Sequence, residues 1–200
     1  NNYHPALLVL SVIFIFFIFL EFFSLSYSFS NYIIDQAHDG TRLVPAQNYL
    51  STKNFWTSSY LTHGGSDIFY PLLMWKILGV ESIGAVRSFS IFLILLVKLF
   101  SIVLSYQLTK ISNLDSNIKI LFFTILTSIL ISLSHYNLLS FGYYLSHRDI
   151  YVILFFFFFI ELFIHSNFRS FSIILISVLA TFSVLLHIDI GIYLNFILIF

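Results

Sequence analysis

The chain has 200 residues, of which 59% are hydrophobic and 9% are charged, and its formal net charge is zero. A soluble domain needs about a quarter of its residues charged to cover its surface, so this composition excludes an ordinary soluble domain. The sequence has no basic run of the kind that binds nucleic acid and no cysteine, which excludes disulfides and thiolate metal sites. We expect an all-α, polytopic bundle of transmembrane helices that forms a single membrane domain in a lipid bilayer.

Six apolar stretches predict the membrane spans, each of which takes about 20 residues of helix. In chain order they are residues 6–30, 88–107, 118–139, 150–164, 171–187 and 190–200. The first is too long for a signal peptide and lacks a basic start. Because the chain begins without Met and ends inside an apolar run, we expect the N-terminal fragment of a longer protein.

Residues 31–87 form the longest connection, and long ordered loops usually carry function. Two stretches in it, residues 41–51 and 67–78, have the pattern of short helices that lie in the membrane interface. In the second stretch, Trp75 and Lys76 are residue types that favour the interface. We therefore expect a structured first loop that packs over the ends of the spans.

Basic residues in the short links predict the orientation of the chain. Lys110 and Lys119 flank one link and Arg169 lies in another, whereas the link between them along the chain has only Arg148. The positive-inside rule then places links 108–117 and 165–170 in the cytoplasm. The segments expected outside are 31–87, 140–149 and 188–189. Six acids belong to these outer segments: Asp35, Asp39, Asp67, Glu81, Asp149 and Asp189.

Two further expectations concern the spans. Glu21 and Lys98 lie about 14 and 15 Å from the outer ends of their helices at helical rise, where an isolated charge is costly, so we expect them to pair. The alternative is that each lines a water-filled cavity separately. The run Phe155–Phe159 is expected to face lipid.

The long loop also carries a spaced motif. It consists of His38-Asp39-Gly40, Pro45-Ala46, Phe55-Trp56, His63-Gly64, Leu78-Gly79 and Arg87. This pattern resembles the first outer loop of bacterial members of the GT-C superfamily, which are integral-membrane glycosyltransferases that use polyprenyl-phosphate-linked sugars. The likeness extends over residues 6–200, with its diagnostic part at 38–87. Two departures are His63, where an aromatic residue is commoner, and Ser51-Thr52, which replaces a Gly-rich turn.

The resemblance implies a catalytic Asp directly after the first span and a second acid in the next outer loop. These are Asp39 and Asp149 in this chain. It also implies two helices along the membrane in the first loop, a polyprenyl-phosphate sugar donor as partner, and a bacterial inner (plasma) membrane with the active site outside. The residues assigned to substrate or phosphate binding are His38, Arg42, His63, Arg87, His147 and Arg148.

The chemistry of such a transfer matches these residue types. A base must take the proton of the acceptor hydroxyl, and positive charge must receive the phosphate leaving group. Asp39 is the candidate base, and Arg148, Arg42 or Arg87 can bind phosphate in a bidentate way. A divalent cation (Mg²⁺ or Mn²⁺) held by Asp39 and Asp149 is another route, and the sequence leaves the choice open.

Less specific interpretations remain open for the same residues. Asp39-Gly40 has the composition of a turn in which Asp39 is a helix N-cap. Asp149 is suited to cap a helix, and Asp189 is suited to a turn. Arg148 is suited to the membrane interface. The runner-up functions are a non-catalytic transporter or flippase-like protein and a structural multi-span subunit. A transporter usually has Gly or Pro in broken spans, and these spans contain almost none.

Overall fold

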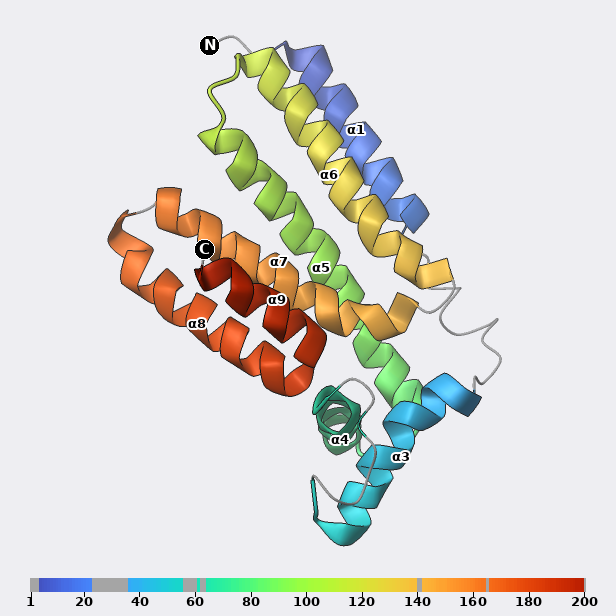
Figure 1. Cartoon of the computed structure of the whole chain (residues 1–200). Helices are drawn as coiled ribbons and strands as arrows, with labels where there is room; N and C mark the ends of the chain where they lie inside the picture. The colour runs from blue at the N-terminus through green and yellow to red at the C-terminus, as the bar shows by residue number, and fades with distance from the viewer. Residues whose placement is uncertain are drawn as a thin grey trace. The chain divides into compact units, whose positions relative to one another are not determined.

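The computed structural model shows that the described part of the chain is helical, without a strand. The described residues are 4–22, 36–55, 61, 64–139, 142–164 and 166–199, with side chains described except at 21–22, 36–39, 41–42, 90–91, 133–139, 142–147 and 166. In chain order the helices are α1 (Pro5–Phe22), α3 (Gln36–Thr52), α4 (Ser66–Leu78), α5 (Ile83–Ile111), α6 (Ser116–Leu139), α7 (Gly142–Ile164), the 3₁₀ turn η1 (Ser166–Phe168), α8 (Arg169–Leu186) and α9 (Ile188–Ile199) (Figure 1).

The chain divides into two compact units. The first unit contains residues 1–24 and 93–177, and the second contains residues 25–92 and 178–200. Helices α5 and α8 each contribute residues to both units.

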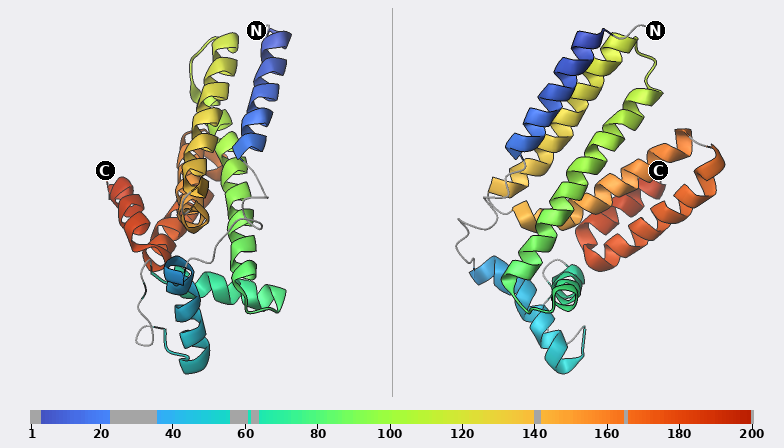
Figure 2. Two further views of the ribbon diagram at one scale, coloured as in Figure 1. Left: turned by 90° about the vertical axis from the view of Figure 1, so that its right-hand side faces the viewer. Right: turned by 180° about the vertical axis from the view of Figure 1, so that it is seen from behind.

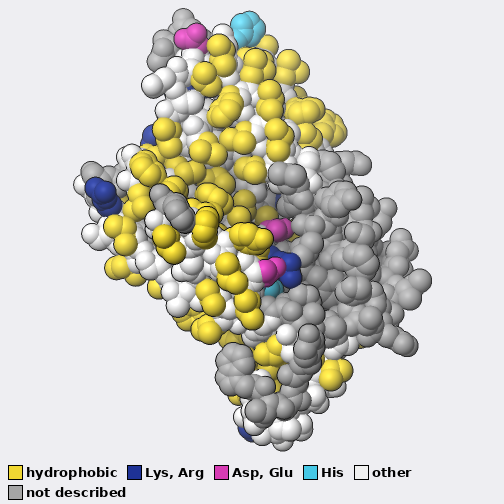
Figure 3. All heavy atoms as spheres, in the orientation of Figure 1, with side chains coloured by type: hydrophobic (Ala, Val, Ile, Leu, Met, Phe, Trp, Pro, Cys, Tyr) yellow, Lys and Arg dark blue, Asp and Glu magenta, His cyan; other side chains and the backbone are white. Residues whose placement is uncertain are grey.

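Among the described residues, two helices, Ile83–Ile111 and Arg169–Leu186, are long and apolar enough to cross a membrane. Apolar surface is also extensive: in α1, large hydrophobic side chains from Leu8 to Leu20 are exposed, whereas Ser11 is buried. Figure 3 shows hydrophobic side chains over much of the described surface on one face, with few charged groups among them. Soluble monomers rarely expose apolar patches of this extent. Both features indicate association with a membrane, as the composition predicts.

In the first unit, α6 packs along α1 and also contacts α7 (Figures 1 and 2). One face of α5 is buried and carries a polar stripe at a spacing of three to four residues: Lys98, Ser101, Ser105 and Thr109. The three hydroxyls donate to the carbonyl four residues earlier, so they are satisfied within the helix. Small side chains of this kind allow close helix packing inside a membrane. Gln107 of α5 donates to the Glu161 carboxylate of α7.

The phenylalanine run of α7 is more buried than expected for a lipid-facing surface. Phe155 is fully buried, and Phe156 to Phe159 are partly buried. The ring of Phe157 packs edge-on against Phe100 of α5 at 5.9 Å, and Phe158 packs against Phe171 at 6.4 Å. Aromatic pairs in this geometry stabilise helix contacts beyond the area that they bury.

Of the expected pair Lys98 and Glu21, the structure describes only the Lys98 side chain. Lys98 is fully buried inside the first unit, as expected for a charge that must avoid lipid. The side chain of Glu21 lies outside the described residues, so the expected pair stays a prediction.

In the second unit, α3, α4 and the start of α5 share a small hydrophobic core. Its buried members are Ala46, Met74, Trp75, Ala85 and Val86, with Leu43, Leu50, Leu72, Leu73 and Phe89 packed against them. Trp75 is therefore in the core, and its indole N–H donates to the Ser82 carbonyl at 3.0 Å. Lys76, the next residue, is exposed. The helices expected at 41–51 and 67–78 are present as α3 and α4, although α3 begins five residues earlier.

Local signals explain where these helices begin and end. The Ser82 hydroxyl accepts from the Ala85 N–H at 3.2 Å, which makes Ser82 the N-cap of α5. Gly79 follows α4 with φ of 67°, the left-handed conformation that ends many helices. Lys53 follows α3 with φ of 58°, directly after the Ser51-Thr52 pair that replaces the Gly-rich turn of the motif. A β-carbon makes this conformation costly, so Lys53 is strained where glycine would not be.

Helices α8 and α9 form a tight hairpin, and the helical backbone is interrupted between them at His187. A β-carbon on Gly191 would lie 2.3 Å from the Cα of Val184, so only glycine fits at this crossing. The side-chain amide of Asn195 donates to the carbonyls of Ala180 and Gly191 at 2.9 and 2.8 Å. These contacts hold the start of α9 against the end of α8.

Candidate functional site

The His38-Asp39-Gly40 segment lies within the first turns of α3, which begins at Gln36. The interpretation of Asp39-Gly40 as a turn ahead of a helix is therefore wrong, because both residues are already helical. The side chains of His38, Asp39 and Arg42 lie outside the described residues, so their assigned roles stay predictions. The helix does place His38, Asp39 and Arg42 within two turns of one another along the chain.

The Pro45-Ala46 pair joins this segment to the core of the second unit. Both residues are buried, and Ala46 has no exposed surface. Pro45 has no N–H to donate to the carbonyl of Thr41, which directly follows Gly40. The helix therefore loses one hydrogen bond beside the segment that carries Asp39, while its next turn is fixed by packing.

Gly64 and Gly65 join the start of α4 to the end of α8. The Gly65 N–H donates to the Leu185 carbonyl at 2.9 Å, which satisfies one of the last carbonyls of α8. Gly64 has φ of 108°, and a β-carbon there would lie 2.9 Å from the Leu186 carbonyl oxygen. Glycine is required at this position both for its backbone conformation and for the close approach. The side chain of His63, the residue before it, lies outside the described residues.

A buried polar cluster lies at this junction. Asp67 and His187 are each 1% exposed, and Ser66 and Tyr70 are also buried. The Ser66 hydroxyl lies 3.5 Å from Nδ1 of His187, and the rings of Tyr70 and His187 are 6.4 Å apart. Asp67 is in the first turn of α4, where the helix dipole favours a negative charge. Because the cluster is closed to solvent, we interpret it as a structural contact that fixes the start of α4 to the connection between α8 and α9.

Arg87, the last residue of the motif, lies in the second turn of α5 within the same unit and is half-buried. It follows the N-cap Ser82 and the core residues Ala85 and Val86, so packing fixes the backbone that carries it. The motif residues Pro45, Ala46, Gly64, Gly79 and Arg87 therefore all belong to one packed unit with α3.

Arg148 and Asp149 lie in α7 and are half-buried. Because α7 begins at Gly142, most of the link expected at 140–149 is helical, and Asp149 is the eighth residue of the helix. The interpretation of Asp149 as a helix cap is therefore wrong. The side chain of His147 lies outside the described residues. Asp149 belongs to the first unit and Asp39 to the second, so a joint role of the two acids stays a prediction.

No family model, curated protein or solved structure matches this chain. Within the described part, no three His, Asp or Glu side chains come together as a metal site would require. The side chain of Asp39, the first candidate ligand, is outside that part.

Sequence reasoning missed the roles of Ser66, Asp67 and His187. Gly64-Gly65-Ser66-Asp67 has the composition of a helix start, which could have indicated that Asp67 lies at a helix N-terminus. No local signal indicates that His187, 121 residues after Ser66, contacts it. Asp189, expected as a turn residue, is exposed in the first turn of α9.

Proposed function

We propose that this protein is a membrane glycosyltransferase of the GT-C type, a hexosyl or pentosyl transferase. It moves a sugar from a polyprenyl-phosphate donor to a lipid, glycan or protein acceptor at the outer face of a bacterial plasma membrane. Its apolar exposed helices, two of them long enough to span a bilayer, support the membrane setting.

The main support for this proposal is that the described residues of the spaced motif lie within one folded substructure. Asp39 is on α3, Pro45 and Ala46 pack that helix into a core, and Gly64 and Gly79 lie where positive φ is needed. A motif that arose from composition alone would not be expected to place its residues in the core and at positive φ. The packing of Pro45 and Ala46 supports a structured segment next to Asp39.

In the proposed reaction, the Asp39 carboxylate takes the proton from the acceptor hydroxyl. The hydroxyl oxygen bonds to the anomeric carbon of the sugar as the bond between that carbon and the phosphate oxygen breaks. The polyprenyl phosphate leaves with the bonding electrons, and its added negative charge is received by arginine. Arg42, Arg87 and Arg148 are the candidates, because guanidinium groups match phosphate oxygens in a bidentate way.

The test is transfer by the full-length protein after Asp39→Asn. A general base contributes roughly 10²–10⁴ in rate, so turnover should fall at least about a hundredfold. Glu81→Gln is the matched control, since Glu81 is an exposed acid of the same long loop and should retain turnover. Donor consumption is measured with a library of polyprenyl-phosphate sugars at matched expression. Near-normal turnover by Asp39→Asn would refute the assignment.

A further inference from the structure

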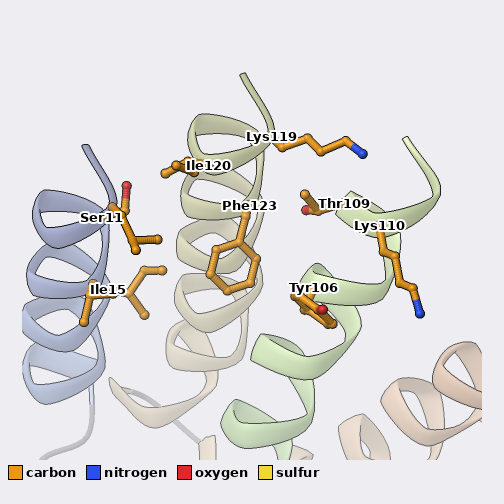
Figure 4. Close-up of a pocket in the computed structure, with 10 residues that line it drawn as sticks. Ser11, Ile15, Tyr106, Thr109, Lys110, Lys119, Ile120 and Phe123 are labelled. Atoms are coloured by element: carbon orange, nitrogen blue, oxygen red, sulfur yellow. The ribbon is translucent and has the colours of Figure 1, made fainter. Parts of the chain in front are cut away.

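A pocket of about 330 Å³ lies in the first unit, between the N-terminal half of α1, the end of α5 and the start of α6 (Figure 4). Its apolar lining comes from α1 and α6: Leu8, Val12, Ile15, Ile120 and Phe123. The volume is at the lower end of the range for ligand pockets. Leu8 and Val12 are about half exposed or more, so the pocket borders apolar surface.

The polar side chains of the pocket lie at the helix ends. Ser11 and Thr109 donate their hydroxyl hydrogens to carbonyls of their own helices, at 2.8 and 2.7 Å. The other polar side chains of the lining are Lys110, Lys119 and Tyr106, whose ammonium and hydroxyl groups can donate to an anion. In Figure 4, Lys119 extends from α6 toward α5, whereas the Lys110 ammonium points away from α6. Lys119 is thus the main donor, and Lys110 adds positive charge beside it.

The charges around this end of the unit favour an anion. The pocket lining includes two lysines and no acid. Asp115, in the link before α6, is exposed and its backbone carbonyl accepts from the Lys119 N–H at 2.8 Å. His4 precedes α1, and its backbone N–H donates to the Asn117 side chain at 3.1 Å, which ties the start of α1 to the start of α6. Lys110, Lys119 and Asp115 together leave one net positive charge.

We propose that this pocket binds an anionic phospholipid, with an acyl chain between α1 and α6 and the phosphate at Lys119 and Tyr106, while Lys110 adds positive charge nearby. An amphiphile fits because the pocket combines an apolar lining with basic groups at one end. Free phosphate would leave the apolar volume unfilled. The positive-inside rule places Lys110 and Lys119 at the cytoplasmic surface, where anionic lipid attracts basic residues. The proposal requires the membrane setting but not glycosyl transfer.

Native mass spectrometry of the full-length protein in detergent tests this with added phosphatidylglycerol or phosphatidylcholine. We expect phosphatidylglycerol to be retained about tenfold better, and the preference to disappear in Lys110→Gln/Lys119→Gln. The charge control is Arg169→Gln, an exposed basic residue outside the pocket, which should keep the preference. Excess inorganic phosphate should not displace the lipid.

A second variant tests the apolar part without changing charge. Val12→Trp should fill the pocket and lower phosphatidylglycerol retention about tenfold. Ile13→Trp is its matched control, because Ile13 is the next residue of α1, is also exposed, and does not line the pocket. Because Val12 is 60% exposed, the larger side chain does not have to enter a packed core.

Several outcomes would overturn the proposal. Equal retention of the two lipids would show that the basic groups select no anion. An equal loss in Arg169→Gln would show attraction to general surface charge, and equal effects of Val12→Trp and Ile13→Trp would show that the pocket is not occupied. Displacement by inorganic phosphate would identify a phosphate site instead. Transfer activity enters none of these measurements, so a failure of the proposed enzyme function would be seen separately.

Discussion

At the scale of single residues, glycine has different physical roles along this chain. Gly79 has a positive φ and open space around it, so its role is conformational. Gly191 has no unusual φ but no room for a β-carbon. Gly64 combines both constraints, whereas Gly84, near the start of α5, is subject to neither. Lys53 is the reverse case, a side-chain-bearing residue in a conformation that suits glycine.

Exchanging glycine at the two helix ends should therefore change stability in opposite directions. Lys53→Gly should stabilise the protein by about 0.5–1 kcal/mol, because it relieves the left-handed strain after α3. It also removes a Lys53 ammonium at 6.0 Å from the Tyr49 ring, a weaker contact at this exposed position. Gly79→Ala should destabilise by about 1 kcal/mol after α4. Thermal unfolding in detergent measures both.

Gly84→Ala is the control for these two variants. It lies in a helix with a nearest neighbour at 3.8 Å, so alanine should stabilise by about 0.5–1 kcal/mol. If Gly79→Ala were as stable as the parent protein, the conformation after α4 would not be the one described.

At the scale of elements, short helices are held by their neighbours and not by their own composition. Helices α3 and α4 each contain a proline, which removes one internal hydrogen bond. Their shared core with the start of α5, and the Trp75 bond to Ser82, compensate for that loss. The α8–α9 hairpin depends in the same way on the Gly191 crossing and on Asn195.

Gly191→Ala should open this hairpin. The added β-carbon would meet the Cα and N of Val184 at 2.3 Å, and backbone atoms within a helix cannot move aside as a side chain can. We expect a loss of at least about 3 kcal/mol in the free energy of unfolding. Ile192→Ala, which truncates an exposed neighbour, should cost much less in the same thermal unfolding experiment. Comparable losses in the two variants would contradict the close crossing.

At the scale of the whole molecule, the predicted topology links the motif to the outer face. It places residues 31–87 and the link at 188–189 on one side of the membrane. Within the second unit, the Gly65 bond to Leu185 brings these two segments together, which agrees with their placement on the same side.

Sidedness can be measured directly because the chain has no cysteine to remove. Thr52 and Asn113 are both exposed, one at the end of α3 and the other between α5 and α6. A membrane-impermeant maleimide should label Thr52→Cys in intact cells and Asn113→Cys only after permeabilisation. The parent protein should stay unlabelled. Labelling of both variants from the same side would contradict the topology and, with it, the outer site.

The sequence by itself determined the helical class, the position of most helices and the residues of the motif. These depend on composition, on the length of apolar runs and on local signals such as Gly79. The start of α7 was placed eight residues too late, because 142–149 are too polar to count as part of an apolar run. The catalytic role of Asp39 was assigned by resemblance and stays a proposal.

Only the tertiary structure decided which side of each helix faces its neighbours. A membrane helix that is apolar all round has no periodicity that separates a buried face from a lipid-facing one. Phe155 and Trp75 were therefore placed at the surface by their residue types, whereas packing buries both. Contacts such as Ser66 with His187, and Gln107 with Glu161, join residues far apart in sequence. They arise because helix ends and buried polar groups take partners from the elements that pack against them.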